Sequence, residues 1–586
     1  MRLRFTLTLL ALASLVLAKA DALFAQATNI RVTNPNARAI LAGDFDVADY
    51  PGGEALDVVD ELAPALLDQL SADSLKALLL ELNTFGNRNT GADTTSATTG
   101  MGAARTWGHD RMLDYAARTG NRLQVGYVAF DQDVCGMAAH RNVLGVLPGT
   151  GPRASEVILV EGHIDSRCAG RCDIDCDADG MEDNASGTAL VLELARVMSA
   201  YRFDRTLAFM LTTGEEQGLI GAAAFADYCV ANDVAVDAVL NNDVIGGVIC
   251  GQTASPPMCP GLNDIDSINV RIFSSTSVRN LARYTKRAYE ARVAPLQAAP
   301  SVIQIQNQED RTGRGGDHIP FREAGFNAIR FTSANEHGDA GVDDPDYSDR
   351  QHTEEDVLGL DTDMDGELDS FFVDFRYLRR NAIINGATAA LLADAPTAPE
   401  RITGEVIDFR TAIEIDDPLG RDSFLLAVRN AGLQTWDTLY TVSRVDTIVL
   451  PVGRWSLSAA YVGDRGLESQ FTPETRLLRV RVSSTGELDA TADDAVELLP
   501  NYPNPFDEAT TLRVFVNDAT LATRRGELVV SDVRGRVLSR LPVSLTPGMH
   551  EVAYAFSANG YQRGTFTYAL LIDGRPVASR QMIYAY

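Results

Sequence analysis

The chain has 586 residues and a formal net charge of -29, with 80 acidic residues against 51 lysines and arginines. A single hydrophobic core seldom extends over so long a chain, so we expect three or four domains. The negative charge argues against nucleic acid or an anionic membrane surface as a partner, because like charges repel.

The first residues have the pattern of an export signal. Arg2 and Arg4 precede the apolar run FTLTLLALASLVLA, and Ala25 and Ala27 offer small residues for cleavage. The run is short for a membrane-spanning helix of roughly 20 apolar residues, and no other stretch approaches that length. We therefore expect residues 1–27 to be a signal peptide and the mature protein to be exported without a transmembrane segment.

Residues 28–74 are predicted to form a helical lead-in to the main domain. The segment DELAPALLDQLSADSLKALLLELNTFGNR carries leucines at helical spacing, and Ser71 with Asp73 and Ser74 offers a cap between two helices. Part of the lead-in could instead be a propeptide that covers the functional site. Both interpretations stay open from the sequence.

Three short apolar runs in the main domain, residues 75–395, predict buried parallel strands. They are EVILVE at 156–161, TLAFMLT at 206–212 and DAVLNN at 237–242. Helical patterns follow the first two, at 187–201 and 218–232. The alternation is typical of an α/β sheet with helices on both faces, in which ligands bind beyond the carboxyl ends of the strands.

Acids and histidines follow these runs at the expected edge of the sheet. The motifs GHIDS, EDNASG, GEEQGL, NNDVIG and HTEED supply His163, Asp183, Glu215, Glu216, Asp243 and His352. Imidazole together with carboxylate suits zinc, so the set predicts a hydrolase with two zinc ions.

Each of these residues can be given a task. Asp183 is the predicted bridge, because a shared carboxylate holds two ions about 3.5–4 Å apart. His163 and Asp243 would complete the site of one ion, and Glu216 and His352 that of the other. Glu215 would stay unbound as the general base. Asp165, two residues after His163, is placed to accept the hydrogen bond from its other ring nitrogen.

The order of these motifs resembles the cocatalytic zinc exopeptidases, the family of the bacterial leucyl aminopeptidases and, more distantly, glutamate carboxypeptidase and the glutaminyl cyclases. The resemblance covers about residues 75–395 and implies the same bridge, base and ligands. It also implies a three-layer, doubly wound sheet of mixed strand direction and an aminopeptidase that acts on peptides or proteins. The alternatives are a carboxypeptidase or glutaminyl cyclase on the same fold, or a surface binding protein without catalysis.

One departure from the family is the insertion CAGRCDIDCDADGME at 168–182. Asp175, Asp177 and Asp179 have the D-x-D-x-D-G spacing of calcium loops, although position twelve is Ser186 instead of glutamate. A second such run, DTDMDGELD, contains Asp361, Asp363, Asp365 and Asp369. Calcium sites and plain solvated acidic loops are both open.

Two further histidines compete for a role. His318, in DHIPF, matches a family segment that lines the substrate pocket, and a purely structural role is equally open. His337, in NEHGD, is a rival to His352 as metal ligand, but the neighbours of His352 match the family pattern better.

All seven cysteines lie in the main domain, at 135, 168, 172, 176, 229, 250 and 259. In an oxidising compartment we expect disulfides with one cysteine left over. Cys168, Cys172 and Cys176 could instead hold a metal, but they have no clear fourth ligand.

Two small all-β sandwich domains are predicted after the linker APTAPERI. Residues 396–484 resemble a fibronectin type III module, with WSLSAAYVGDRGLES as the best match. Residues 490–586 resemble the carboxy-terminal sorting domain of the type-nine secretion system, through NYPNPF at 501–506, DVRGRV at 532–537 and the Gly548 turn. This resemblance implies secretion machinery as a partner, transport across the outer membrane and a secreted or cell-surface location.

Overall fold

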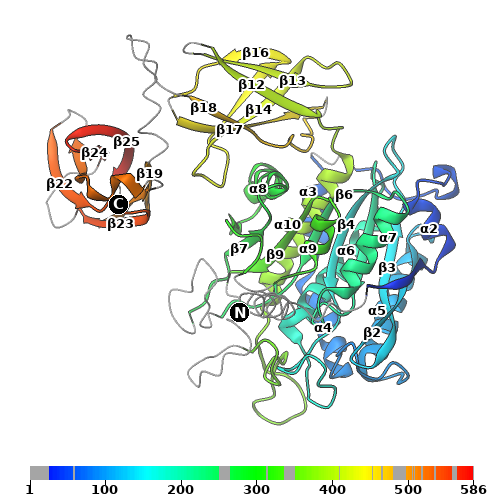
Figure 1. Cartoon of the computed structure of the whole chain (residues 1–586). Coiled ribbons are helices and arrows are strands. Elements are labelled where there is room, and N and C mark those ends of the chain that lie inside the picture. The colour runs from blue at the N-terminus through cyan, green and yellow to red at the C-terminus, as the bar shows by residue number, and fades with distance from the viewer. Residues whose placement is uncertain are drawn as a thin grey trace, which may run out of the picture. The chain divides into compact units, whose positions relative to one another are not determined.

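The computed structural model divides the chain into two compact units (Figure 1). The first contains Met1–Ala398 with Ala460–Pro473, and the second contains Pro399–Ala459 with Glu474–Tyr586. The structure describes residues 26–56, 60–249, 264–311, 315–334, 350–407, 410–451, 453–463, 466–479, 496–504, 506, 509–516, 519–532, 536–556 and 564–584. Most of the predicted signal peptide and the rival ligand His337 lie outside these residues.

The first unit is built on a nine-stranded sheet of order β1-β2-β3-β5-β4-β6-β9-β7-β8. Its centre, from β5 through β4 and β6 to β9, is parallel, whereas β1, β2 and β3 pair antiparallel and β7 runs antiparallel to β9. The predicted mixed strand direction is confirmed. The strands are β1 (Thr28–Val32), β2 (Gln124–Val134), β3 (Met137–Leu147), β4 (Glu156–His163), β5 (Thr206–Thr212), β6 (Ala235–Asn242), β7 (Asn269–Phe273), β8 (Val302–Ile305) and β9 (Ala328–Ser333).

Helices pack against both faces of this sheet (Figure 1). Val157 and Leu159 of β4 join a core with side chains of α2, α7 and α9, whereas Ile158 and Val160 are buried on the opposite face, where α6 and α10 contact β4. Alternate residues of a strand point to opposite faces, so the run Val157–Val160 is apolar throughout because both faces of β4 are covered. The helices are α2 (Pro35–Leu41), α3 (Leu62–Gln69), α4 (Ala72–Leu82), α5 (Gly100–Arg118), α6 (Ser186–Met198), α7 (Ile220–Ala231), α8 (Arg279–Arg292), α9 (His318–Glu323) and α10 (Phe375–Asp394).

The segment predicted as a lead-in is an integral part of this unit. Its first residues form β1, which pairs with β2, and the side chains of α2 enter the core. The two predicted helices are α3 and α4, and both pack against α10. The hydroxyl of Ser71 caps α4 by accepting a hydrogen bond from the backbone N–H of Ser74 at 3.3 Å, as predicted.

Two disulfides staple the inserted loop, so the idea that Cys168, Cys172 and Cys176 hold a metal is wrong. Cys168 pairs with Cys176, and Cys172 pairs with Cys135 at the end of β2. Thiols locked in disulfides offer no thiolate to a metal ion. Cys229 is buried and unpaired, and the two remaining cysteines, at 250 and 259, lie outside the described residues.

The second unit consists of antiparallel sheets, as alternating apolar and polar residues predicted. Three strands in the order β12-β13-β16 and four in the order β15-β14-β17-β18 cover the first β-rich segment, and β19-β20-β23 with β22-β21-β24-β25 cover the last. The strands are β12 (Arg401–Ile407), β13 (Arg410–Asp416), β14 (Ser423–Asn430), β15 (Thr438–Ser443), β16 (Val445–Ile448), β17 (Gly453–Tyr461), β18 (Thr475–Arg479), β19 (Val496–Tyr502), β20 (Ala509–Val516), β21 (Gly526–Asp532), β22 (Val537–Val543), β23 (Gly548–Ala555), β24 (Gly564–Ile572) and β25 (Arg575–Tyr584).

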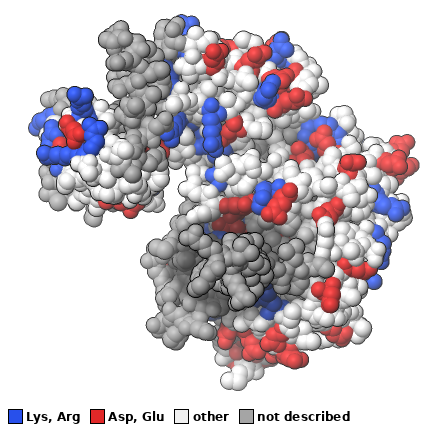
Figure 2. All heavy atoms as spheres, in the orientation of Figure 1, with Lys and Arg blue, Asp and Glu red and all other residues white. Residues whose placement is uncertain are grey.

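The described surface carries both signs of charge. On the face drawn in Figure 2, acidic and basic side chains are interspersed over much of the described surface. Among the described residues, no helix has the length and apolarity needed to cross a membrane.

Candidate metal centre

The predicted ligands come together at the carboxyl edge of the parallel strands. His163 is the last residue of β4, Asp243 directly follows β6, and Glu215 and Glu216 lie between β5 and α7. Because β5, β4 and β6 are parallel neighbours, the residues after them emerge at the same edge.

Asp183 reaches the same edge from the turn that leads into α6. Its φ and ψ of -110° and 90° are not helical, and neither are those of Asn184, at -137° and 46°. The next residue, Asn184, donates a hydrogen bond to the carbonyl of Asn242 and accepts one from the backbone N–H of Val244. The turn that carries Asp183 is therefore tied to the end of β6, beside Asp243.

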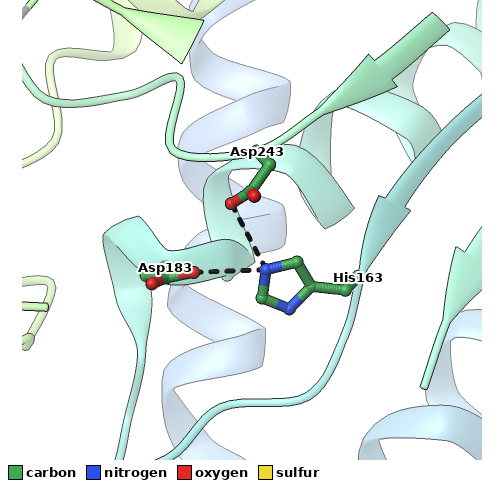
Figure 3. Close-up of side chains that lie close together, drawn as sticks. All are labelled: His163, Asp183 and Asp243. Carbon is green, nitrogen blue, oxygen red and sulfur yellow. Dashed lines mark hydrogen bonds and ion pairs between the residues drawn. The ribbon is translucent and has the colours of Figure 1, made fainter. Parts of the chain in front are cut away.

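The first cluster consists of His163, Asp183 and Asp243 (Figure 3). Nε2 of His163 lies 3.2 Å from Oδ1 of Asp183 and 3.3 Å from Oδ1 of Asp243. All three side chains are buried. One imidazole nitrogen thus faces two carboxylates at once.

The second cluster consists of Asp183, Glu216 and His352. Nε2 of His352 lies 3.1 Å from Oδ2 of Asp183 and 3.0 Å from Oε2 of Glu216. His352 comes from the segment between β9 and the short strand β10 (Gly359–Leu360), far along the chain from the other ligands. Asp183 belongs to both clusters and turns a different oxygen to each histidine.

These spacings fit a metal centre better than a set of hydrogen bonds. A ring N–H can be directed at one carboxylate oxygen, yet each histidine nitrogen has two at nearly equal distance. Ligand atoms on one tetrahedral zinc, each about 2.0–2.1 Å from the ion, lie about 3.3 Å apart. The three buried carboxylates of the two clusters, Asp183, Glu216 and Asp243, also need positive charge nearby to offset the cost of burying them.

The carboxylates and histidines of the clusters shift the pKa values of one another. Burial lowers the pKa of the His163 imidazole, but its hydrogen bonds to Asp165, Asp183 and Asp243 outweigh burial and raise that pKa well above the usual value. Burial raises the pKa of Asp183, and the two histidines outweigh it and hold the pKa well below the ordinary range. Asp183 is therefore an anion, as its predicted role as a bridge requires.

Glu215 lies beside the two clusters and belongs to neither. Burial raises the pKa of its carboxyl well above the usual value, and the carboxylates of Asp243 and Glu216 raise it further, while His163 lowers it. A carboxylate with a raised pKa close to a metal centre is suited to accept a proton and to give it back.

Asp165 lies against the other ring nitrogen of His163, as predicted, and it also contacts the two glutamates. Nδ1 of His163 lies 3.0 Å from the backbone carbonyl of Asp165 and 3.5 Å from its carboxylate. The carboxylate instead accepts hydrogen bonds from the backbone N–H groups of Glu215 at 3.3 Å and Glu216 at 3.2 Å. Asp165 thus orients the histidine through its main chain and holds the two glutamates through its side chain.

Sequence reasoning missed a second carboxylate of this supporting kind, Asp356. Its oxygens accept hydrogen bonds from the backbone N–H groups of Glu182 and Asp183 at 2.9 and 3.0 Å. Burial raises the pKa of Asp356 to about 7, against the lowering effect of these hydrogen bonds. Its place in the motif HTEED, close to the predicted ligand His352, was the available signal, but the sequence does not show that Asp356 is buried whereas Glu354 and Glu355 are exposed.

Two arginines also contact ligands and were not predicted. Arg330, in the middle of β9, lies 2.9 Å from Oδ2 of Asp243 and 2.9 Å from Oδ1 of Asp310. Arg167 lies 2.7 Å from Oε2 of Glu216 and 2.6 Å from Nδ1 of His352. An arginine inside the apolar run AIRF was a usable signal for Arg330, because a charge there needs a buried partner.

Arg88 holds the loop between His163 and Asp183. This fully buried side chain donates to the carbonyls of Ile164 at 2.8 Å and Gly180 at 2.9 Å, and also to that of Asp179. It therefore ties the chain just before the insertion to the end of the insertion, while the disulfides fix the part between them.

The two acidic loops differ in structure. The carboxylates of Asp361, Asp363 and Asp365 lie together, and Asp369 accepts hydrogen bonds from Thr362 nearby. Over the described part of the chain, the side chains predicted in the first loop, Asp175, Asp177 and Asp179, do not form such a group. Calcium binding at either loop stays a prediction.

His318 begins α9 and is completely buried. Its Nε2 lies 3.0 Å from the carbonyl of Glu309 and 3.9 Å from Oδ2 of Asp310. Among the described residues it belongs to neither ligand cluster, and its predicted pocket role stays a prediction.

The chain is similar to known zinc proteases in sequence. The family model described as "Peptidase family M28" matches residues 142–367, which contain every residue of both clusters. A probable zinc metalloprotease of Pyricularia oryzae is 32% identical over 374 residues, covering 60% of this chain and 71% of the relative. A probable zinc metalloprotease of Pyrenophora tritici-repentis is 30% identical over 417 residues, covering 67% of this chain and 82% of the relative. Among solved structures, the LapA aminopeptidase of Legionella pneumophila has a TM-score of 0.42 and 18% identity, covering 59% of this chain and 78% of that chain.

Proposed function

Because the chain belongs to peptidase family M28 and is a zinc metallopeptidase, we propose that it is an exported aminopeptidase that works with two zinc ions. The observation that carries the proposal is the shared carboxylate. Asp183 directs Oδ1 to His163 and Oδ2 to His352, so one side chain serves two ligand clusters. A carboxylate in this position is the usual bridge of a two-metal hydrolase.

The residues would hold the ions in two sets of three. His163, Asp183 and Asp243 form one set, and Asp183, Glu216 and His352 form the other. Zinc bound there would act as a Lewis acid on the scissile carbonyl and lower the pKa of a water molecule.

Glu215 is the residue we assign to proton transfer. Its carboxyl has a raised pKa and stands outside both ligand sets, so it can take a proton from the attacking water and return it to the leaving amine. Asp165 holds the backbone of Glu215 through a hydrogen bond and so keeps this group in place. A positioned base of this kind is worth about 10²- to 10⁴-fold in rate.

The choice of an aminopeptidase rests on the motif order GHIDS, EDNASG, GEEQGL, NNDVIG and HTEED, which resembles that of bacterial leucyl aminopeptidases. The first peptide bond of a peptide or protein with a free amino terminus would then be the substrate. A carboxypeptidase would instead need a substrate with a free carboxyl terminus, and a glutaminyl cyclase would act on amino-terminal glutamine.

The two β-rich segments that follow the peptidase domain are assigned to an accessory module and a sorting domain. Each contains three strands in one sheet and four in another, which suits a sandwich. We assign residues 396–484 to a fibronectin type III-like module and residues 490–586 to a sorting domain that carries the enzyme through the type-nine secretion machinery. Recovery of extracellular protein with an intact Tyr586 terminus would argue against removal of the sorting domain during export.

A substrate panel tests the enzymatic part of the proposal. Aminoacyl peptides with blocked carboxyl termini are compared with amino-blocked peptides with free carboxyl termini, each with and without a zinc chelator. Cleavage of the first group alone, abolished by chelator, is the expected result. Dependence on a free carboxylate would overturn the aminopeptidase assignment, and cyclisation of amino-terminal glutamine without hydrolysis would identify a glutaminyl cyclase.

A further inference from the structure

The two ligand clusters are contacted by two arginines in different ways. Arg330 contacts Asp243 of the first cluster, and Arg167 contacts Glu216 and His352 of the second. The atoms involved decide whether each arginine can stay in place when a metal ion is bound.

Arg330 leaves the ligand atoms of its cluster accessible to a cation. It pairs with Oδ2 of Asp243 at 2.9 Å, while the other oxygen, Oδ1, faces His163. The Arg330 side chain has no solvent exposure and is anchored on its far side by Asp310. It can therefore stay in place and hold Asp243 with one oxygen directed at the metal.

Arg167 occupies the ligand atoms themselves. Its Nε lies 2.7 Å from Oε2 of Glu216, which is the oxygen that faces Nε2 of His352 at 3.0 Å. Its terminal nitrogen lies 2.6 Å from Nδ1 of His352. A guanidinium has N–H donors only, so Nδ1 must accept this hydrogen bond, and the proton of a neutral ring is then on Nε2.

A metal ion on Nε2 of His352 requires the opposite arrangement. Nε2 must then be free of its proton, and Nδ1 carries the N–H of the neutral ring. Two donors would face each other across 2.6 Å if Arg167 kept its place. Glu216 could offer its second oxygen, Oε1, to the ion, but that would not resolve the conflict at His352.

Arg167 is less enclosed than Arg330. Its side chain is 14% exposed, against 0% for Arg330. Apart from Glu216 and His352, its hydrogen bonds within the described chain go to the backbone carbonyls of Cys168 and Ala169. Glu216 is the carboxylate with which it pairs, so a metal that takes Glu216 also removes the counter-charge of Arg167.

We propose that Arg167 is a displaceable occupant of the Asp183–Glu216–His352 cluster, which makes this half of the centre the weaker and more readily exchanged zinc site. The His163–Asp183–Asp243 cluster, whose arginine does not compete with the metal, is the tighter site. The inference rests on the proposed two-zinc function and adds an order of occupancy to it.

The test measures zinc content of the full-length protein after equilibration with buffers of graded free zinc. Wild-type protein should lose its two ions in two separate steps. In Arg167→Met the step that belongs to the weaker site should occur at about 10- to 100-fold lower free zinc, which is the scale of one charge-assisted hydrogen bond. The step that belongs to the tighter site should occur at the same free zinc as in wild type. His352→Ala should abolish the weaker step and keep the tighter one, which assigns each step to its cluster.

Controls separate the possible failures. Arg111→Met removes an arginine that pairs with Glu81 away from both clusters and should leave both steps unchanged. Arg167→Lys keeps a positive charge but cannot contact Glu216 and His352 with one planar group. It should therefore shift the step of the weaker site in the same direction as Arg167→Met, but by less. This variant replaces Arg167→Met if that protein does not fold.

A step of the weaker site that does not move, or that moves to higher free zinc, overturns the inference. Wild-type protein that binds one zinc would contradict the two-zinc function itself.

Discussion

Nε2 of His352 lies 3.1 Å from Oδ2 of Asp183. The other oxygen of that carboxylate lies 3.2 Å from Nε2 of His163, at the end of β4. One side chain therefore joins residues that are 189 positions apart in the sequence, 163 and 352. The proposed two-zinc chemistry depends on this relationship.

Glu215→Gln should abolish most hydrolysis while zinc stays bound. Glutamine has the same shape but cannot accept the proton of the attacking water, so turnover should fall about 10²- to 10⁴-fold. Metal content and turnover are measured on the same sample. Glu290→Gln, an exposed glutamate paired with Lys286, is the matched control and should keep full activity. Near-normal turnover in Glu215→Gln would remove Glu215 from its role.

Asp165→Asn should weaken the site without unfolding the protein. The asparagine amide would place N–H donors against the backbone N–H of Glu215 or Glu216, so one of two hydrogen bonds is lost. We expect turnover or zinc affinity to fall about 10- to 100-fold. The far-ultraviolet circular dichroism spectrum should be unchanged. An effect smaller than twofold on both quantities would show that these bonds do not position the glutamates.

The part of the site that could be predicted consists of residues fixed by local pattern. His163 and Asp243 follow apolar runs that form adjacent parallel strands, so their meeting at one sheet edge followed from the topology rule. Glu215 and Glu216 follow the neighbouring strand β5 for the same reason.

The sequence marked Asp356 and Arg330 as unusual, but the contacts of these supporting residues could not be predicted, because their partners are set by packing between distant segments. Asp356 accepts from the backbone of Glu182 and Asp183, and Arg330 reaches Asp310 and Asp243 from a third strand. No spacing in the sequence reports such contacts. The same holds for the lead-in, whose β1 joins the main sheet through a pairing with residues near position 130.

Removal of the Cys135–Cys172 disulfide should destabilise the protein more than removal of Cys168–Cys176. The first closes a separation of 37 residues and the second a separation of 8, and a longer loop gains more conformational freedom in the unfolded chain. Double serine replacement of the first pair should lower the free energy of unfolding by about 2–4 kcal/mol. Chemical denaturation of both variants checks the order. An equal loss in the two variants would contradict it.

Asp317→Asn should stabilise the metal-free protein at high pH and have little effect at low pH. Burial raises the pKa of Asp317 to about 7, from an ordinary value of 3.8. Between these values the folded chain holds a proton that the unfolded chain has lost, so this group's contribution to stability is full below about pH 4 and is lost as the pH rises through 7. Asparagine carries no charge to bury and can still accept from the hydroxyl of Thr212, the present partner.

Thermal unfolding of chelator-treated wild type and Asp317→Asn from about pH 5 to about pH 8 measures this effect. The melting temperature of the variant minus that of wild type should increase with pH. A difference that stays constant or decreases with rising pH would contradict the raised pKa of Asp317.

The most direct test of the central claim is to locate and count zinc in crystals of the zinc-loaded protein by anomalous diffraction. We predict two ions per chain, one between His163 and Asp243 and one between Glu216 and His352, with Asp183 bound to both. Asp183→Asn, which replaces one ligand oxygen with an amide nitrogen, should lose at least one of them. A single ion in the wild-type protein, or two ions of which neither contacts Asp183, would contradict the account.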